Sequence, residues 1–533
     1  MHGGRVAGRE WAMRIVCGLA AALACALLML APNPASAREL KCSNLRDIAL
    51  DHAEVTKITT EALDNKSSAC RIRVTAKLAP DSVVRIEVWI PVGEAWNGKF
   101  VQFGNGGFAG SIPSPFLQAL AARGYAAAAT DDGHKADRDT DARWAMRHPE
   151  KVRDYGWRAL KATTDTGKIM ITAQKGVGPG KSYFEGCSDG GREALIEAQR
   201  YPNDFDGIVA GAPANDIIRL LGYMALQAQA LVNTPGAYLG PPQLALLQAA
   251  ALRACAGGGA FIRDPLACAF DPGQVACKPG QDPSACLTAE QVAAARTLYA
   301  GLRDRSGKVV MPGLTPGGEA QPGGWSDWVT GPSQDGIAGA LGNQFANGFF
   351  KYFVFEDPAY DILRLDLGAD LERVRDKLSK DLDAIDPDLG RFKAHGGKLI
   401  QYHGWNDPAI PAHSSIIYYE DVARTLGSTD AFYRLYMVPG MLHCGDGTGP
   451  GNVDWLGLLD RWVTTGEAPG GVVAASGSPR AVAPADGSTQ LLCPYPQITV
   501  RDPTRGSFQC ALAAPPDPPA AKPRPKAKSR PHA

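Results

Sequence analysis

The sequence predicts an α/β protein in which a largely parallel sheet, covered by helices, is interrupted by an inserted lid domain and stabilised by disulfides. Runs of β-favouring residues alternate with helical stretches over residues 38–213 and again over residues 391–512. That alternation is typical of a parallel sheet covered on both faces. It is lost over residues 214–390, which we interpret as the lid. An even number of cysteines after the N-terminal leader indicates a disulfide framework.

The overall charge of the chain gives no indication of a polyanionic partner. The 533 residues include 55 Lys and Arg against 55 Asp and Glu. We therefore expect binding neither to nucleic acid nor, once the leader is removed, to a membrane surface. The 60 glycines and 40 prolines indicate a loop-rich globular protein, not a helix bundle. Residues 513–533 are rich in Pro, Lys and Arg and predict a disordered tail.

The N-terminus has the features of a secretory signal peptide. Arginines precede an apolar run over residues 15–31, and Ala35-Ser36-Ala37 is a small-residue cleavage site. We expect residues 1–37 to be removed and the mature protein to be secreted or periplasmic. A single-span anchor is the alternative, disfavoured because the apolar run is short and ends in prolines.

The cysteine count agrees with export. Cys17 and Cys25 lie in the leader, and the other ten stand at positions 42, 70, 187, 255, 268, 277, 286, 444, 493 and 510. In an exported chain such a set favours disulfides. Metal binding is the alternative, but the sequence has no Cys-x-x-Cys pair, which makes a zinc site unfavourable.

The first predicted strands form an antiparallel edge, because polar and apolar residues alternate over 70–78 and 82–90 around a turn at Pro80-Asp81. The core elements before the lid are a strand at 99–103, a helix at 117–123, strands at 124–130 and 182–185 separated by a helix at 152–175, and a strand at 205–213. The elements after the lid are strands at 397–403 and 432–438, each followed by a helix, at 413–426 and 454–465.

A candidate nucleophile lies between the strand at 182–185 and the next helix. Gly186, Ser188 and Gly190 form a G-x-S-x-G turn, the nucleophile elbow of an α/β-hydrolase. The glycines allow a strained turn and close passage of the backbone. Ser188 then stands at a helix N-terminus, where free N–H groups favour a developing negative charge.

The remaining members of a triad follow in the chain order Ser, Asp, His. Asp407 and His443 each follow a predicted strand, where the fold needs its acid and its base. The histidines at 134, 148, 403 and 413 are less favoured, since they precede the nucleophile or flank Asp407. Ser188 would attack the ester carbon, His443 would transfer the proton, and Asp407 would hold the imidazole.

Oxyanion donors and a crosslink complete the predicted site. We expect the amide of Asp189 and one from Gly106 or Gly107 to stabilise the oxyanion, each contributing about 3 kcal/mol. Cys187 precedes the nucleophile and Cys444 follows the base, so a bond between them would tie Ser188 to His443.

Aromatic side chains are dense in the predicted lid. We expect them to form its core more than a substrate-binding surface. They are Trp325, Trp328, Phe345, Phe349, Phe350, Tyr352, Phe353 and Phe355.

These motifs resemble the tannase and feruloyl esterase family. The resemblance rests on residues 186–191, on Gly404-Trp405-Asn406-Asp407 and on His443-Cys444, with support from residues 104–108 and 286–292. It runs from about Cys42 to Cys510. It implies an exported α/β-hydrolase with a lid that cleaves esters of aromatic acids, such as gallates, hydroxycinnamates or mono(2-hydroxyethyl) terephthalate. It also implies the disulfides 187–444, 42–70, 255–268, 277–286 and 493–510.

One segment departs from the family pattern. The resemblance implies a lid loop dense in aspartates that binds calcium, but residues 255–265 keep only Asp264. Calcium takes six to eight oxygen ligands. We therefore expect no cofactor, a lost or weakened calcium site, and a Cys255–Cys268 bond bracing the loop instead.

The sequence thus predicts a serine carboxylesterase for small esters of phenolic or aromatic acids. Two other functions stay open: a non-catalytic binding protein on a hydrolase scaffold, and a serine peptidase of the same fold. A terephthalate-type monoester hydrolase is the alternative within the esterase class.

Overall fold

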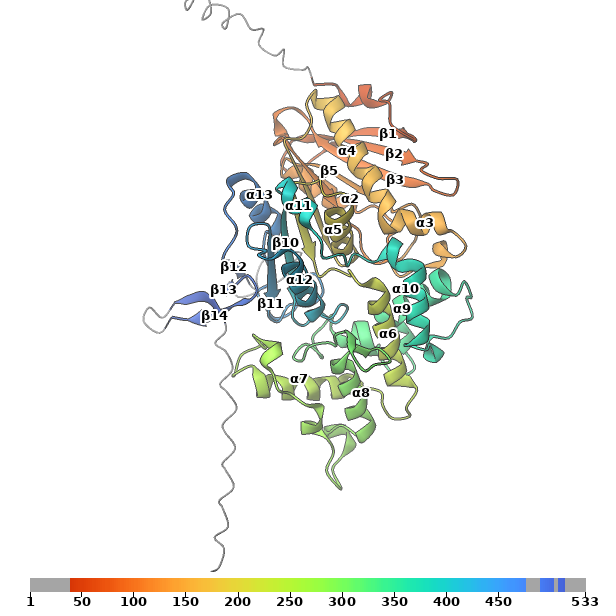
Figure 1. Cartoon of the computed structure of the whole chain (residues 1–533), viewed down its shortest axis with the longest axis vertical. Coiled ribbons are helices and arrows are strands. Elements are labelled where there is room, and N and C mark those ends of the chain that lie inside the picture. Colours follow the sequence, from red (N-terminus) through yellow and green to blue (C-terminus); the bar gives the residue numbers. More distant parts are fainter. Residues whose placement is uncertain (1–38, 476–488, 503–506, 513–533) are drawn as a thin grey trace, which may run out of the picture.

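The computed structural model describes residues 39–475, 489–502 and 507–512. The predicted signal peptide (1–37) and tail (513–533) lie outside the described residues. A nine-stranded sheet runs in the order β1-β2-β3-β5-β4-β6-β7-β10-β11 (Figure 1). Its strands are β1 Ala53–Ala62, β2 Ser68–Ala76, β3 Val84–Pro91, β4 Lys99–Phe103, β5 Ala126–Thr130, β6 Lys181–Cys187, β7 Gly207–Gly211, β10 Lys398–Gly404 and β11 Tyr433–Val438.

The sheet changes direction along its width. Strands β5, β4, β6, β7, β10 and β11 are parallel, whereas β1, β2 and β3 pair antiparallel with one another and β3 pairs antiparallel with β5. The predicted antiparallel edge is therefore confirmed. Strand β1 was not predicted, because as the outermost strand it buries few side chains and its sequence has no clear apolar alternation.

Helices cover both faces of the sheet. On one face, α4 (Ala159–Lys175), α5 (Asp189–Arg200) and α12 (His413–Leu426) bury side chains in one apolar cluster with the strands. On the other face, α2 (Ser114–Ala122) and α13 (Trp455–Thr465) do the same. The predicted α/β-hydrolase class is confirmed.

The helix predicted at 152–175 is built from three pieces. Helix α3 (Pro149–Arg153) passes into a π-helical turn, η4 (Asp154–Arg158), before α4 begins. Such turns are often found at functional sites. Here the turn places Tyr155 and Gly156 against α5, the helix that follows the candidate nucleophile.

Between β7 and β10 the chain forms a separate body over the C-terminal ends of the strands. Its helices are α6 Ile217–Val232, α7 Pro241–Cys255, α8 Ala289–Ala300, α9 Leu341–Gly348 and α10 Ala369–Leu382, with a short hairpin, β8 Leu302–Arg303 and β9 Val309–Met311. Most of these residues share one apolar core, which also takes in Phe108 and Ile410 from the sheet loops. The next helix, α11 Gly390–His395, packs with the sheet through Phe392. We refer to residues 214–390 as the insert; in Figure 1 its helices α7 and α8 lie at the end opposite to β1–β3.

The C-terminal segment adds two small ladders that the sequence did not predict. They pair β12 (Val472–Ala475) with β13 (Thr489–Leu492) and β14 (Gln497–Arg501) with β15 (Phe508–Leu512). All five implied disulfides are present: 42–70, 187–444, 255–268, 277–286 and 493–510.

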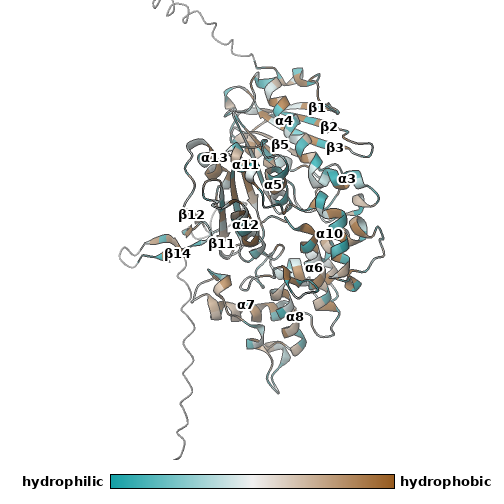
Figure 2. Ribbon diagram, viewed as in Figure 1, coloured by the Kyte–Doolittle hydropathy of each residue, from teal (hydrophilic) through white to brown (hydrophobic). Residues whose placement is uncertain are grey.

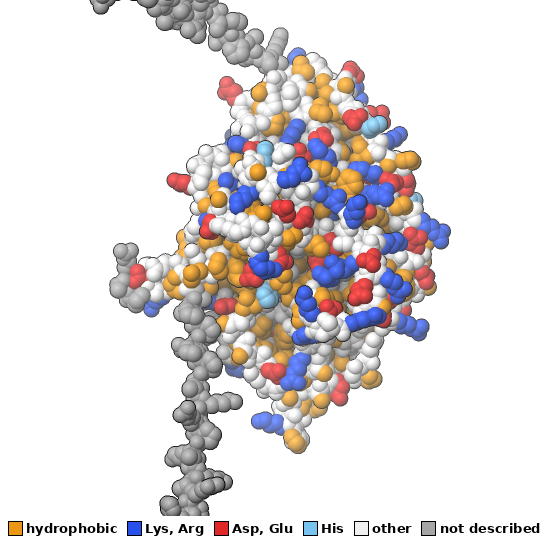
Figure 3. Space-filling view, in the orientation of Figure 1, with side chains coloured by type: hydrophobic (Ala, Val, Ile, Leu, Met, Phe, Trp, Pro, Cys, Tyr) orange, Lys and Arg blue, Asp and Glu red, His pale blue; other side chains and the backbone are white. Residues whose placement is uncertain are grey.

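The surface is polar and mixed in charge. Figure 2 shows hydrophilic residues along exposed helices such as α3 and α10, and on the face seen in Figure 3 acidic and basic side chains are interspersed. Within the described ranges, we find no helix with the length and apolar character needed to cross a membrane.

A half-buried ion pair joins the part of the core before the insert to the part after it, and its removal tests how strongly the two parts are coupled. Asp460 on α13 binds Lys99 Nζ of β4 at 2.6 Å and accepts a hydrogen bond from Tyr183 Oη of β6 at 2.6 Å. We predict that Asp460→Asn lowers the free energy of unfolding by about 1–3 kcal/mol, since Lys99 loses its partner. Denaturant unfolding measures this. Arg305→Gln breaks an exposed ion pair with Asp366 and serves as control; an equal loss in both variants would contradict the prediction.

Candidate active site

The candidate nucleophile sits in a strained turn between β6 and α5. Ser188 has φ 65° and ψ −121°, a backbone conformation that L-residues rarely adopt. The turn is crowded: a Cβ on Gly190 would lie 2.7 Å from the carbonyl oxygen of Asn105. Glycine at this position therefore lets the elbow approach the glycine-rich loop after β4, which brings Ser188 beside the predicted oxyanion donors.

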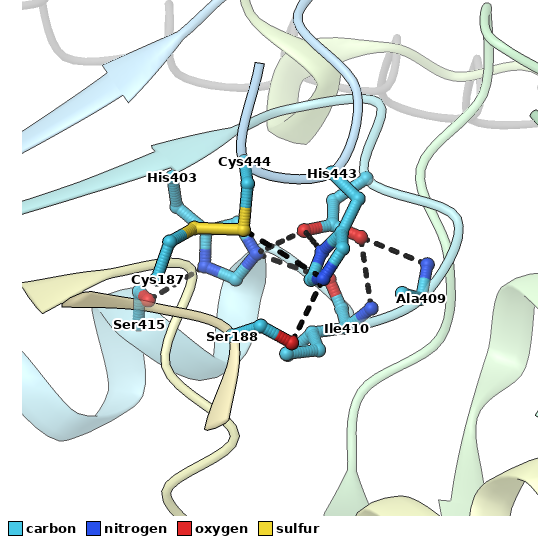
Figure 4. Close-up of a disulfide and its surroundings, with 9 residues drawn as sticks. Cys187, Ser188, His403, Ala409, Ile410, Ser415, His443 and Cys444 are labelled. Carbon is cyan, nitrogen blue, oxygen red and sulfur yellow. Dashed lines mark hydrogen bonds and ion pairs between the residues drawn. A yellow bond between two sulfur atoms is a disulfide. The ribbon is translucent and has the colours of Figure 1, made fainter. Parts of the chain in front are cut away.

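The three predicted triad residues meet above the C-terminal ends of β6, β10 and β11. His443 Nε2 lies 2.9 Å from Ser188 Oγ, and His443 Nδ1 lies 2.8 Å from Asp407 Oδ2 (Figure 4). With Nδ1 protonated toward the carboxylate, Nε2 is free to accept the serine proton. The arrangement is that of a nucleophile, a general base and an orienting acid.

The Asp407 carboxylate is fully buried yet has partners on both oxygens. Its Oδ1 accepts hydrogen bonds from the amides of Ala409, at 2.8 Å, and Ile410, at 2.9 Å. Burial opposes ionisation, but the charge and hydrogen bonds of His443 and His403 outweigh it and hold the pKa of Asp407 below its usual value. The carboxylate is thus ionised at neutral pH and can orient His443.

A second histidine, not predicted for the site, also contacts Asp407. His403 Nε2 lies 3.1 Å from both Asp407 Oδ2 and the carbonyl oxygen of Ile410, while its Nδ1 lies 2.7 Å from Ser415 Oγ. Two acceptors at Nε2 require the proton there, so Ser415 donates to Nδ1. His403 therefore fixes the orientation of the acid. Its place four residues before Asp407, at the end of β10, was the available sequence clue.

The bond between Cys187 and Cys444 joins the nucleophile strand to the loop that carries the base (Figure 4). The two cysteines are 257 residues apart in sequence. Closing so long a loop stabilises the fold by about 5 kcal/mol in the chain-entropy model. Since each cysteine neighbours a triad residue, the bond also limits the separation of Ser188 and His443.

The predicted oxyanion donors are backbone amides near Ser188. Within the described residues, the amides of Asp189, Gly106 and Gly107 have no acceptor in the protein. Gly107 and Asp189 line one cavity with Ser188, but Gly106 does not. The structure therefore brings the predicted pair Asp189 and Gly107 together at the nucleophile, and of the two glycines it favours Gly107.

The side chain of Asp189 points away from this cavity, into a buried network. It accepts hydrogen bonds from Tyr155 Oη at 2.8 Å and from Arg192 Nε at 2.6 Å. Arg192 is itself fully buried and donates to the carbonyl oxygens of Tyr155 and Gly156 in the π-helical turn. The network fixes the N-terminus of α5, and with it the Asp189 amide.

Two further buried acids hold the oxyanion loop from behind. Glu193 Oε2 accepts from the amide of Asn105 at 2.8 Å, and Asp132 Oδ2 accepts from Asn105 Nδ2 at 3.0 Å. The other oxygens, Glu193 Oε1 and Asp132 Oδ1, are buried without a partner. We predict that the two acids share a single proton, which would satisfy both oxygens. Burial, followed by repulsion from Glu193, raises the pKa of Asp132 well above its usual value.

Asp132, Glu193 and Asp189 also form the one cluster among the described residues with carboxylate oxygens close enough to bind a metal. Each of the three already has hydrogen-bond or ion-pair partners. In the loop predicted to have lost calcium, Asp264 accepts from the amide of Leu266, and Cys255 is bonded to Cys268.

An apolar cavity opens at Ser188. It is lined by Gly107, Phe108, Ser188, Asp189, Ala214, Ile217, Leu220, Leu221, Met224, Trp328, Phe345, Ala409 and Ile410. Trp328 and Phe345 are aromatic residues of the insert that we expected to be core, and Trp328 also contacts the ring of His443 edge-on, with centroids 5.0 Å apart. The insert therefore contributes directly to this site.

A family model, sequence relatives and solved structures all relate this chain to the same family. Residues 69–513 match the family model described as tannase and feruloyl esterase. An uncharacterized esterase of Xanthomonas campestris pv. campestris is 36% identical over 480 residues, 82% of each chain. Feruloyl esterase C of Talaromyces stipitatus is 30% identical over 433 residues, 76% of this chain and 78% of its own. The solved structure of feruloyl esterase B from Aspergillus oryzae has a TM-score of 0.78 at 25% identity and covers 88% of this chain and 100% of its own.

The shared-proton pair can be tested by substitution at Glu193. We predict that Glu193→Ala lowers kcat about 10- to 100-fold, because the Asn105 amide loses its acceptor and the oxyanion loop its support. Glu193→Gln keeps an acceptor for Asn105 and a donor for Asp132, so it should retain most activity at neutral pH.

A proton shared by Asp132 and Glu193 also predicts that wild type and Glu193→Gln differ in how activity and thermal stability depend on pH. A raised pKa in the folded state means that the stability contributed by the protonated form is present at low pH and lost as pH rises through that pKa. Wild type should therefore lose activity and thermal stability at alkaline pH, where two adjacent carboxylates repel, and Glu193→Gln should lose less. Identical alkaline profiles in pH–rate and thermal-melting measurements would count against the shared proton.

Proposed function

The chain belongs to the tannase and feruloyl esterase family and is a carboxylic ester hydrolase, and we propose that it cleaves esters of phenolic acids with a Ser188-His443-Asp407 triad through an acyl-enzyme. The observation that carries the proposal is the continuous hydrogen-bond chain from Ser188 Oγ to the Asp407 carboxylate, at the wall of an apolar cavity. Names of relatives support the substrate class: several are called feruloyl esterases.

In the first half-reaction Ser188 Oγ attacks the ester carbonyl carbon while its proton passes to His443 Nε2. The negative charge that develops on the carbonyl oxygen is stabilised by the amides of Asp189 and Gly107. Asp407 stabilises the imidazolium that forms. The tetrahedral intermediate then expels the alcohol, which takes the proton from His443, and the acyl group remains on Ser188.

In the second half-reaction water replaces the alcohol. His443 removes a proton from the water as it attacks the acyl carbon, and returns that proton to Ser188 Oγ as the acid leaves. The crosslink between Cys187 and Cys444 supports both steps, since it restrains the loops that carry Ser188 and His443.

One alternative function explains less of this geometry, and two others differ from the proposal only in the substrate. A non-catalytic binding protein would not need an intact triad or a strained nucleophile turn, which costs free energy to maintain. A peptidase would use the same triad, and only turnover of amides against esters separates the two. A monoester hydrolase of terephthalate type differs in the acyl group alone.

We also propose that the mature protein works outside the cytoplasm. Five disulfides fit an oxidising compartment. The expected signal peptide and cleavage after Ala37 agree with secretion or a periplasmic location.

The triad proposal predicts the effect of removing the nucleophile. Ser188→Ala should lower kcat for methyl ferulate, methyl gallate or a terephthalate monoester by at least about 10⁴-fold, as when the nucleophile of such a triad is removed. Oxidatively folded wild type, assayed in parallel, identifies the preferred acid. Ester turnover that survives in a correctly folded Ser188→Ala would contradict the mechanism, and faster turnover of the matching amide would favour a peptidase.

Calcium should have little effect on this protein. The loop over residues 255–265 offers one carboxylate, Asp264, which already caps the short helix η5 (Pro265–Ala267). A weakly bound ion adds little to the free energy of unfolding. We therefore predict that calcium or chelator shifts the thermal midpoint by less than about 1 °C. Differential scanning fluorimetry measures this, and a shift of several degrees would show that a site is present.

A further inference from the structure

The cavity at Ser188 is far less polar than the phenolic acids that an esterase of this family could meet. Apart from Ser188, Asp189 and the indole N–H of Trp328, its lining side chains are apolar or glycine. Asp189 contributes its backbone, because its carboxylate is bound to Tyr155 and Arg192. An acyl group in the cavity therefore has hydrogen-bond donors near its carbonyl oxygen, whereas the rest of the group is surrounded by mostly apolar side chains.

The cavity takes the acyl side of the ester. Gly107, Asp189 and Ser188, which would contact the carbonyl group, form one part of its wall. His443, which must reach the leaving oxygen, is not among the lining residues. We therefore assign the cavity to the group retained on Ser188 and place the alcohol on the side of His443.

The far wall belongs mainly to the insert. Helix α6 contributes Leu220, Leu221 and Met224, while Trp328 and Phe345 add aromatic faces. All but Trp328 are at least nine-tenths buried.

We propose that, among the aromatic acids open to this enzyme, the cavity selects an aryl acyl group that is uncharged and has at most one hydroxyl, such as a feruloyl, cinnamoyl or benzoyl ring, over a galloyl ring or the carboxylate-bearing ring of a terephthalate monoester. The inference rests on the proposed triad mechanism. Its physical basis is desolvation: a hydroxyl buried without a partner is unfavourable, and an unpaired carboxylate far more so.

The direct test compares two esters that differ at one position. Methyl p-toluate and monomethyl terephthalate share a leaving group and ring, and differ by a para methyl against a para carboxylate. We expect kcat/KM for the toluate to exceed that for the monoester by at least about 100-fold. Methyl benzoate should likewise exceed methyl gallate by at least about tenfold. Ratios near one, or reversed, would overturn the proposal.

A cation placed in the cavity should reverse part of this preference. Met224→Lys puts an ammonium group at the far wall, and we expect it to narrow the toluate-to-monoester ratio by at least about tenfold. Val232→Lys adds the same charge to the same helix outside the cavity, where Val232 is 40% exposed, and should leave the ratio unchanged. An equal effect of both variants would mean that long-range charge, not the cavity, sets the preference.

Binding of boronic acids gives a second measurement, independent of turnover and of whether Met224→Lys folds. Phenylboronic acid should inhibit wild type at least about 100-fold more tightly than 4-carboxyphenylboronic acid, since both add to Ser188 Oγ. Equal inhibition would overturn the proposal.

Hydrolysis of a small acetyl ester, which Ser188→Ala should abolish, tests the triad mechanism separately from the selectivity of the cavity. If the acetyl ester is cleaved but the kcat/KM ratios between the paired aryl esters are near one, the triad mechanism is supported and the selectivity proposal is wrong. If no ester is cleaved in the presence of an intact fold, both fall.

Discussion

The site depends on one buried carboxylate. Asp407 lies at the end of β10 without solvent exposure and accepts hydrogen bonds from two histidines and two backbone amides. Removing any of these partners would leave part of a buried charge unsatisfied, which is among the more costly changes a folded protein can undergo. Because the carboxylate is held from several sides, it can hold His443 in one tautomer and one orientation.

Close packing of backbone around the elbow is the second constraint. The glycine-rich loop after β4, the turn at Ser188 and the π-helical turn before α4 meet at distances that exclude a side chain at Gly190. Buried polar groups then fill the space between them: Arg192 joins the turn to the nucleophile helix, and the acids Asp132 and Glu193 hold Asn105. The oxyanion donors are thus positioned by interactions that face away from the substrate.

Much of this could be predicted from the sequence, because it depends on local pattern. The G-x-S-x-G turn, the strand ends that carry Asp407 and His443, and helix α12 over 413–426 all follow from residues near one another in the chain. The domain boundaries at 214 and 390 stay predictions. The pairing of Asp132 with Glu193 was not predicted, because it joins elements far apart in sequence. His403 contacts residues near it in the chain, but the residue pattern does not show that its ring faces Asp407. Trp328 could not be assigned, since a buried aromatic residue has the same sequence pattern whether it faces a core or a cavity.

The disulfides have a consequence for how the enzyme acquires its activity. Ten cysteines can pair in about a thousand ways, and the number of pairings grows steeply with their count. Four of the native bonds span only 9 to 28 residues, and short loops close with the smallest loss of entropy. Once they form, Cys187 and Cys444 are the two thiols left, so local oxidation leads to the one long-range bond at the active site. A mispairing that consumes Cys187 or Cys444 would leave the nucleophile and its base unlinked, so catalytic competence requires that the other eight cysteines pair among themselves.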